Sequence, residues 1–158
     1  MQEYNNPEAW AAAIAAQTRL PDGFRLATTS LEFIPQERPE GKPYPMRLSL
    51  VLADRPSTAF AGMYTRNAFP GAPVVVGREM LKGTQAQAIL INNKVSNVGS
   101  PTGIADARAL CAGIARECGI APDLVFPAST GIIGWRPARC GGEQRNNVRF
   151  VVDRRIFL

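Results

Sequence analysis

Two segments of the chain repeat their apolar residues with the period of a helix. The first follows Asn6, Pro7 and Glu8, which are a capping residue, a proline suited to the first helical turn and an acid at the positive end of the helix dipole. We expect this alanine-rich helix to end near Leu20. The second runs from about residue 102 to 118, before a glycine that favours a helix end. Its expected apolar face comprises Ile104, Ala107, Cys111, Ile114 and Cys118.

Shorter runs of apolar or alternating residues predict strands. Residues 46–52 alternate and then become continuously apolar, as a strand in a sheet would. We expect a hairpin from this strand to residues 58–65 through a turn at 54–57, whereas the proline-rich residues 35–45 predict an exposed loop. Several strands with two helices predict an α/β fold, a mixed layered arrangement of sheet and helices. The other expected strands are residues 23–27, 73–76, 86–92 and 124–128.

The chain contains no histidine and three cysteines. The absence of histidine excludes Ser-His-Asp and Cys-His catalysis, and His-ligated zinc or iron, within this chain. Acyl-transfer chemistry would therefore need another base, such as the α-amine of an N-terminal nucleophile. We expect Cys111 and Cys118 to be small buried hydrophobes rather than reactive or metal-binding thiols. Widely spaced cysteines, no long apolar run and no signal-peptide pattern predict a reduced, cytoplasmic protein without a membrane span.

The net charge of +5 is concentrated near the C-terminus. Residues 136–155 contain six arginines against two acids, whereas residues 1–134 are almost neutral. We therefore divide the chain into a domain at 1–134 and a divergent basic tail at 135–158, in which only residues 148–158 show a weak strand pattern. Nucleic-acid binding by the tail is an alternative that we disfavour, because no aromatic platform or known binding module accompanies the arginines.

The candidate for chemistry is Ser129-Thr130-Gly131, which follows the last expected strand. A side-chain hydroxyl and a neighbouring backbone N–H at such a turn can together hold a developing oxyanion, and glycine lets a ligand approach the main chain closely. Small residues also end many strands simply to make a turn, so this motif alone leaves both interpretations open.

Four motifs, in order and at matching spacing, resemble a known family. Residues 62–74 (GMYTRNAFPGAPV) resemble its G-x-[FY]-T-x-N stretch, and residues 88–92 (AILIN) resemble the strand before its asparagine-rich loop. Residues 102–108 (TGIADAR) are similar to its TG…DAR helix entry, and residues 129–134 (STGIIG) match its S-T-G-[VI]-I-G segment. The family is the ornithine acetyltransferases, the ArgJ-like glutamate N-acetyltransferases of arginine biosynthesis. The resemblance covers roughly residues 20–134, the front part of a complete member.

The resemblance implies the α-chain part of the αββα-type architecture of DmpA- and ArgJ-like proteins. Members cut themselves into α and β chains, and the new N-terminal threonine of the β chain is the nucleophile, which is not present here. It takes acetyl from N-acetylornithine and passes it to glutamate by ping-pong transfer in an α/β heterotetramer. The family's oxyanion-binding roles carry over to the Thr130 hydroxyl and the Gly131 N–H. No cofactor or metal is implied, although acetyl-CoA is an additional acetyl donor to consider.

The sequence departs from the family in two places. Residues 92–97 read NNKVSN where relatives typically read NSGNAN, so that Lys94 and Val95 replace a glycine and an asparagine. Either the pocket changes, or this is a surface turn that tolerates change. After Gly134 the composition changes abruptly, and the family's cleavage threonine has no counterpart. A truncated or frame-shifted product and a divergent α-like protein both explain this ending.

These observations favour the α portion of an acetyltransferase, which would be active only with a β chain. The alternative is a truncated, non-catalytic α-like domain that acts as a remnant or interaction module and exposes part of its sheet.

Overall fold

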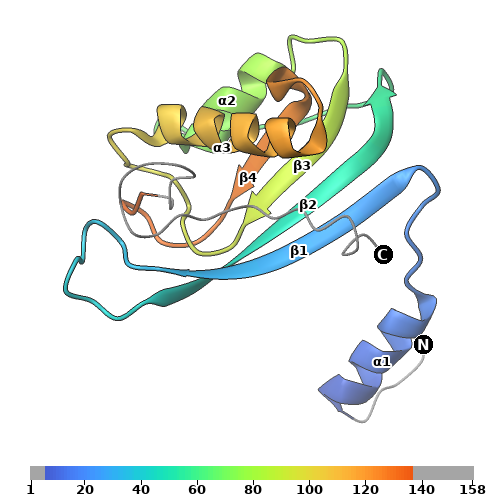
Figure 1. Ribbon diagram of the computed structural model, residues 1–158, viewed down its shortest axis with the longest axis horizontal. Helices are drawn as coiled ribbons and strands as arrows, with labels where there is room; N and C mark the ends of the chain where they lie inside the picture. The colour runs from blue at the N-terminus through green and yellow to red at the C-terminus, as the bar shows by residue number, and fades with distance from the viewer. Residues whose placement is uncertain (1–5, 137–158) are drawn as a thin grey trace.

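The computed structural model describes residues 6–136, which form a four-stranded sheet in the order β1-β2-β3-β4 with helices on one face (Figure 1). In chain order the elements are α1 (Pro7–Gln17), β1 (Phe24–Phe33), β2 (Tyr44–Ser57), α2 (Ala72–Met80), β3 (Ala86–Asn92), α3 (Gly103–Cys118), a 3₁₀ turn η1 (Pro122–Leu124) and β4 (Val125–Ser129).

Mixed pairing defines the sheet. β1, β2 and β3 pair antiparallel, whereas β3 and β4 are parallel and are joined by α3, which crosses back over the sheet. Parallel neighbours need such a crossover because the chain must return to the same end of the sheet. The predicted mixed, layered α/β fold is therefore confirmed.

The main core lies between α3 and the covered face of the sheet. Cys111 and Ile114 of α3 pack with Leu50, Leu90 and Val125 from three strands, and all five side chains are buried. The opposite face is covered only in part by the described residues: Phe60 packs edge-on against Phe126 of β4, with ring centroids 5.8 Å apart, and lines a groove together with Ile89. On this face, register aligns Leu26 with Val51 and Val51 with Ile89; Leu26 is 40% exposed and Ile89 45%.

The prediction for α3 is confirmed almost to the residue. The helix spans Gly103–Cys118 and ends at Gly119, whose φ of +68° is the left-handed conformation that closes many helices. Ala107, Cys111 and Ile114 are buried as expected, and Cys118 is partly buried. Ile104 is instead 41% exposed, because the buried stripe is rotated towards Leu110 and Ala115. Burial also raises the pKa of the Cys111 thiol to about 12, which agrees with a small buried hydrophobe.

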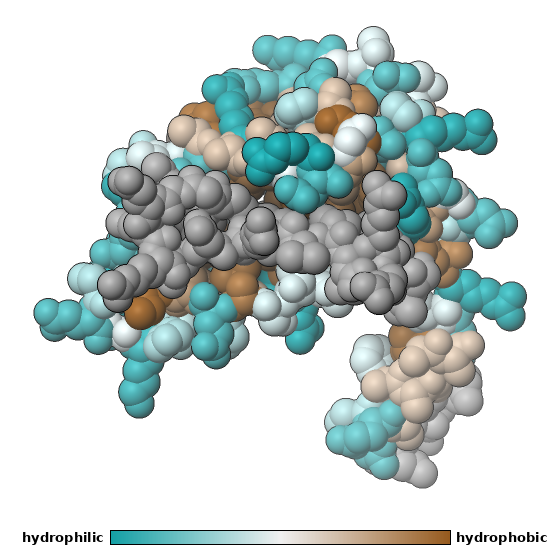
Figure 2. Space-filling model, in the orientation of Figure 1, coloured by the Kyte–Doolittle hydropathy of each residue, from teal (hydrophilic) through white to brown (hydrophobic). Residues whose placement is uncertain are grey.

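The first helix also forms where the sequence predicts it. The Asn6 side chain accepts the Ala9 N–H at 2.7 Å, and Pro7 is the first helical residue. The helix ends at Gln17, three residues before the expected end, and buries none of its residues. It extends away from the sheet in Figure 1, and Figure 2 shows its largely apolar surface, where Trp10 is 54% exposed.

Two strand predictions were wrong. The expected turn at 54–57 does not form, because β2 continues to Ser57 and pairs there with Ala86 of β3 after a shift in register. Residues 58–65 are neither strand nor helix, so the expected hairpin is replaced by the β1–β2 pair across the proline-rich loop.

Residues 73–76 form the first turns of α2 rather than a strand. Their valines favour a strand in isolation, but Pro73 fits the first turn of a helix. In this position Val76 and Ala72 pack against Ala107 of α3. Helix–helix packing therefore outweighs local propensity.

The expected domain at 1–134 and tail at 135–158 stay a prediction, because most of the tail, including the weak strand pattern at 148–158, lies outside the described residues. Trp135 and Arg136 are described and make contacts given below. No helix within residues 6–136 is both long and apolar enough to cross a membrane.

Candidate functional site

The loops after β3 and β4 lie side by side at one edge of the sheet, where parallel strands bring their carboxyl ends together. The Thr130 N–H donates to the Asn92 carbonyl at 3.1 Å, and the Ile132 N–H donates to the Lys94 carbonyl at 3.0 Å. An isolated parallel bridge joins Val95 to Ile132. The turn that contains Thr130 and Gly131 is therefore held against the β3 loop on both sides.

Thr130 and Gly131 are both exposed at this turn. Within residues 6–136, neither the Thr130 hydroxyl nor the Gly131 N–H has a hydrogen-bond partner. Two adjacent donors without a protein acceptor at an exposed turn are available to a ligand oxygen, which is what an oxyanion site requires.

Glycine is the one residue that fits at position 131. Its φ is +132°, a region that side-chain-bearing residues avoid, and a Cβ there would lie 2.2 Å from the Lys94 carbonyl oxygen. Gly131 is therefore packed directly on the β3 loop, and its N–H has a fixed direction.

Asn92, at the end of β3, links the two strand ends and was not predicted as a site residue. Its side chain is buried, with Nδ2 donating to Ser129 Oγ at 2.6 Å and Oδ1 accepting the Val95 N–H at 3.3 Å. The signal in the sequence was a polar residue at the end of an apolar strand, which must find partners when buried.

The unusual residues of the β3 loop have different environments. Val95 is fully buried and packs in a second apolar cluster with Phe33, Met46, Leu48 and Trp135, whereas Lys94 is half-buried. The interpretation as a surface turn is therefore wrong for Val95, because its side chain is part of a core.

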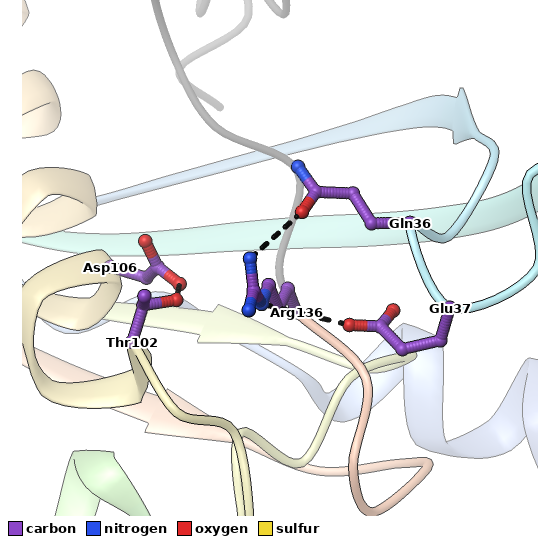
Figure 3. A network of polar contacts seen from close by, with 5 residues as sticks. All are labelled: Gln36, Glu37, Thr102, Asp106 and Arg136. Carbon is purple, nitrogen blue, oxygen red and sulfur yellow. Dashed lines mark hydrogen bonds and ion pairs between the residues drawn. The ribbon is translucent and has the colours of Figure 1, made fainter.

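The segment after the turn is anchored to the β1–β2 loop. Trp135 packs edge-on against Phe33 and Tyr44, with ring centroids 6.2 and 5.0 Å apart. Arg136 donates to Gln36 Oε1 at 3.1 Å and pairs with Glu37 at 3.8 Å (Figure 3). The turn is therefore fixed on its C-terminal side as well.

Two further features concern the start of α3 and a groove beside β4. At the start of α3, the Thr102 hydroxyl donates to the buried Asp106 carboxylate at 2.5 Å (Figure 3). An apolar groove of about 370 Å³ includes Ser129 in its lining and is lined by no charged side chain. Tyr64 lines the groove, and burial raises the pKa of its hydroxyl. No cluster of three side chains suited to a metal occurs among the described residues.

The family model described as the ArgJ family matches residues 40–139. The chain belongs to the ArgJ family. The match includes Thr130 and Gly131 and extends five residues past Gly134. Membership of the family is thus established over the strands, the helices and the turn that form the candidate site.

Relatives of this ArgJ-family chain come from bacteria and fungi. It is 39% identical over 127 residues to the "Arginine biosynthesis bifunctional protein ArgJ" of Nitratidesulfovibrio vulgaris, covering 75% of this chain and 30% of that relative. It is 31% identical over 140 residues to the mitochondrial protein of the same name from Talaromyces marneffei, covering 86% of this chain and 29% of that relative. The chain thus spans less than a third of the length of these relatives.

Solved structures confirm the fold. A structure of ornithine acetyltransferase complexed with ornithine, from Mycobacterium tuberculosis, matches with a TM-score of 0.61 and 28% identity, covering 75% of this chain and 61% of that one. ArgJ from Bacillus halodurans matches with a TM-score of 0.57 and 23% identity, covering 72% and 56% of the two chains.

Proposed function

We propose that this chain is the α portion of an ArgJ-type acetyltransferase of arginine biosynthesis and contributes its oxyanion site. The observation that carries the proposal is an exposed pair of donors on Thr130 and Gly131 that have no partner within residues 6–136, at a turn fixed by hydrogen bonds and by a glycine-only conformation. Family membership and the absence of histidine are consistent with it.

The proposed reaction transfers acetyl from N-acetylornithine to glutamate in two steps. The hydroxyl oxygen of a threonine on a β chain attacks the acetyl carbonyl carbon, while the threonine's own α-amine takes the proton. The carbonyl oxygen becomes an oxyanion and accepts hydrogen bonds from the Thr130 hydroxyl and the Gly131 N–H. Collapse of this intermediate breaks the C–N bond, and the protonated α-amine gives its proton to the leaving nitrogen, so that ornithine departs as the amine. The glutamate amine then attacks the acetyl-threonine ester and passes a proton to the α-amine, which returns it to the threonine oxygen as the C–O bond breaks.

The geometry explains why these two donors would favour the transition state. Donors that are held in place before the reaction need no reorganisation when charge develops on the oxygen. Gly131 is held by its contact with the Lys94 carbonyl, and Thr130 by the bond from its N–H to Asn92. The chain contributes stabilisation of charge, whereas the nucleophile and base belong to the β chain.

The proposal includes a β chain that arises by self-cleavage of a precursor, an α/β heterotetramer, a cytoplasmic setting and no bound cofactor. Acetyl-CoA remains an additional acetyl donor within it. The partly exposed apolar face of the sheet supports the need for a companion chain, because Leu26, Ile89 and Ile91 are each between 37% and 45% exposed among the described residues.

Reconstitution tests this function. The chain is co-expressed with a β chain from a relative, and the purified assembly is given N-acetylornithine and glutamate. We expect N-acetylglutamate to form with ping-pong kinetics, and the acetylated intermediate to be detected by mass spectrometry on the β-chain threonine. A stable assembly that transfers no acetyl group would favour the alternative of a non-catalytic, α-like interaction module.

A further inference from the structure

Asn97, in the loop between β3 and α3, joins the starts of two helices. Its backbone carbonyl accepts the Ala72 N–H at 2.9 Å at the first residue of α2, and its side-chain Nδ2 donates to the Gly103 carbonyl at 3.0 Å at the first residue of α3. The residue is only 2% exposed. It is also the one described non-glycine residue with a positive φ, at +56°. Asparagine adopts this conformation more readily than most residues.

The helix starts approach Asn97 so closely that its position has little freedom. A Cβ on Gly103 would lie 2.7 Å from Asn97 Oδ1 and 3.1 Å from the Ala72 Cβ. The contact therefore depends on a glycine at the start of α3. Because α2 and α3 are packed against each other and against the sheet, Asn97 is attached to the rigid part of the fold.

The residues on either side of Asn97 hold the segment that follows Thr130 and Gly131. Both the N–H and the hydroxyl of Ser96 donate to the Ile132 carbonyl, at 3.1 and 2.9 Å. The Val98 carbonyl accepts the Gly134 N–H at 2.8 Å. Asn97 thus lies at the centre of the connection between the helix starts and the candidate oxyanion turn.

The side-chain oxygen of Asn97 suggests that stability alone does not explain why asparagine occupies this position. Its Oδ1 is buried and has no hydrogen-bond partner within the described residues. An unpaired buried acceptor and a left-handed backbone both cost stability. Glycine at this position would remove both costs, so the asparagine is best explained by what its Nδ2 donor holds in place.

We propose that Asn97 is a positioning residue of the oxyanion site, which fixes the direction of the Gly131 N–H by tying the β3 loop to the starts of α2 and α3. This inference rests on the proposed acetyl transfer. Asn97 does not reach the Thr130–Gly131 donors through any hydrogen bond of its own; it acts through Ser96 and Val98.

The decisive variant is Asn97→Gly, which keeps the left-handed backbone accessible and removes only the side-chain anchor. In the assembled enzyme we expect kcat to fall roughly 10- to 100-fold, because small displacements of a catalytic donor have effects of this order. KM should change by less than about twofold, since the lost interaction is made in the transition state. In the ¹⁵N-labelled chain, the amide resonance of Gly131 should shift.

A matched control is Ile114→Val, which thins the core beneath α3 without touching this loop. It should lower the melting temperature and leave kcat and the Gly131 amide resonance unchanged. An Asn97→Gly enzyme with wild-type kcat, or one that loses activity only in proportion to its unfolded fraction, would overturn the positioning role.

The two proposals fail in distinguishable ways. A wild-type assembly without acetyl transfer would refute the proposed function. The Asn97 inference would then be judged by the Gly131 amide resonance, and an unchanged resonance in Asn97→Gly would refute the structural connection as well.

Discussion

At the scale of single residues, Gly131 in the turn after β4 meets two requirements at once, a backbone conformation that favours glycine and a close contact with the neighbouring loop. Gly131 must adopt a φ of +132°, and it must also leave space for the Lys94 carbonyl, which a Cβ would approach to 2.2 Å. The consequence is a closely constrained backbone at an exposed residue, whose N–H has little freedom to change direction.

Gly131→Ala should therefore lower both stability and activity. Forcing alanine into this conformation costs on the order of 1–3 kcal/mol, before the clash with Lys94 is counted. We expect a lower melting temperature for the chain and a loss of acetyl transfer in the assembled enzyme.

Gly119→Ala is the matched control for this variant, because Gly119 also has a positive φ, of +68°, but a Cβ there would meet nothing within 4 Å. It should reduce stability through strain alone and leave kcat unchanged. Equal kcat in the two variants would show that the geometry of Gly131 does not matter for the reaction.

At the scale of elements, sequence patterns predicted β3, α3 and β4 well because each has one dominant signal. Ala86–Asn92 contains the continuous apolar run of residues 88–91, and Gly103–Cys118 has a helical stripe with a glycine stop. The failures at residues 58–65 and 73–76 occurred where local propensity opposed long-range packing. Pairing of β2 with β3 and packing of α2 on α3 decided those segments, and neither contact can be read from local sequence.

The candidate site was only partly predictable for the same reason. Thr130 and Gly131 were identified from a motif, although their proposed role is still a prediction. Asn92 and Asn97 were missed because their partners are distant or on other elements. Asn92 binds Ser129, 37 residues away in sequence, and Asn97 binds the first residues of two helices.

Burial of the Cys111 thiol in α3 predicts that the stability of the chain depends on pH in the alkaline range. Burial raises the pKa of Cys111 from 9.0 to about 12, so the folded state keeps a proton that the unfolded chain releases. The stabilising preference for the thiol is complete below pH 9 and is lost as pH rises towards 12. We expect the melting temperature of the wild-type chain to fall more steeply over pH 9–11 than that of Cys111→Ala. Parallel curves for the two chains would contradict burial of this thiol.

At the scale of the whole molecule, α3 covers one face of the sheet, whereas the described residues cover the other face only in part, where Phe60 packs on Phe126. Leu26, Ile89 and Ile91 lie on the other face, within a layer that soluble proteins normally bury. The isolated chain should therefore associate with itself at raised concentration and associate with a β chain when one is present.

Substituting both Ile89 and Ile91 with lysine should shift the chain towards monomer in analytical ultracentrifugation and prevent assembly with a β chain. The control is Ile14→Lys, since Ile14 is similarly exposed, at 45%, but lies on α1. If the Ile14 variant prevented assembly and the double variant did not, the companion chain would have to bind elsewhere.

The central claim is that Thr130 stabilises the oxyanion formed during acyl transfer. The most direct test is the single-turnover rate of acetyl-enzyme formation in the assembled protein, measured for wild type, Thr130→Ala and Thr130→Ser. We predict that Thr130→Ala lowers this rate by about 10²–10³, the usual effect of removing one such donor, while Thr130→Ser, which keeps the hydroxyl, stays within about tenfold of wild type. A Thr130→Ala enzyme that forms its acetyl intermediate at the wild-type rate would contradict the account.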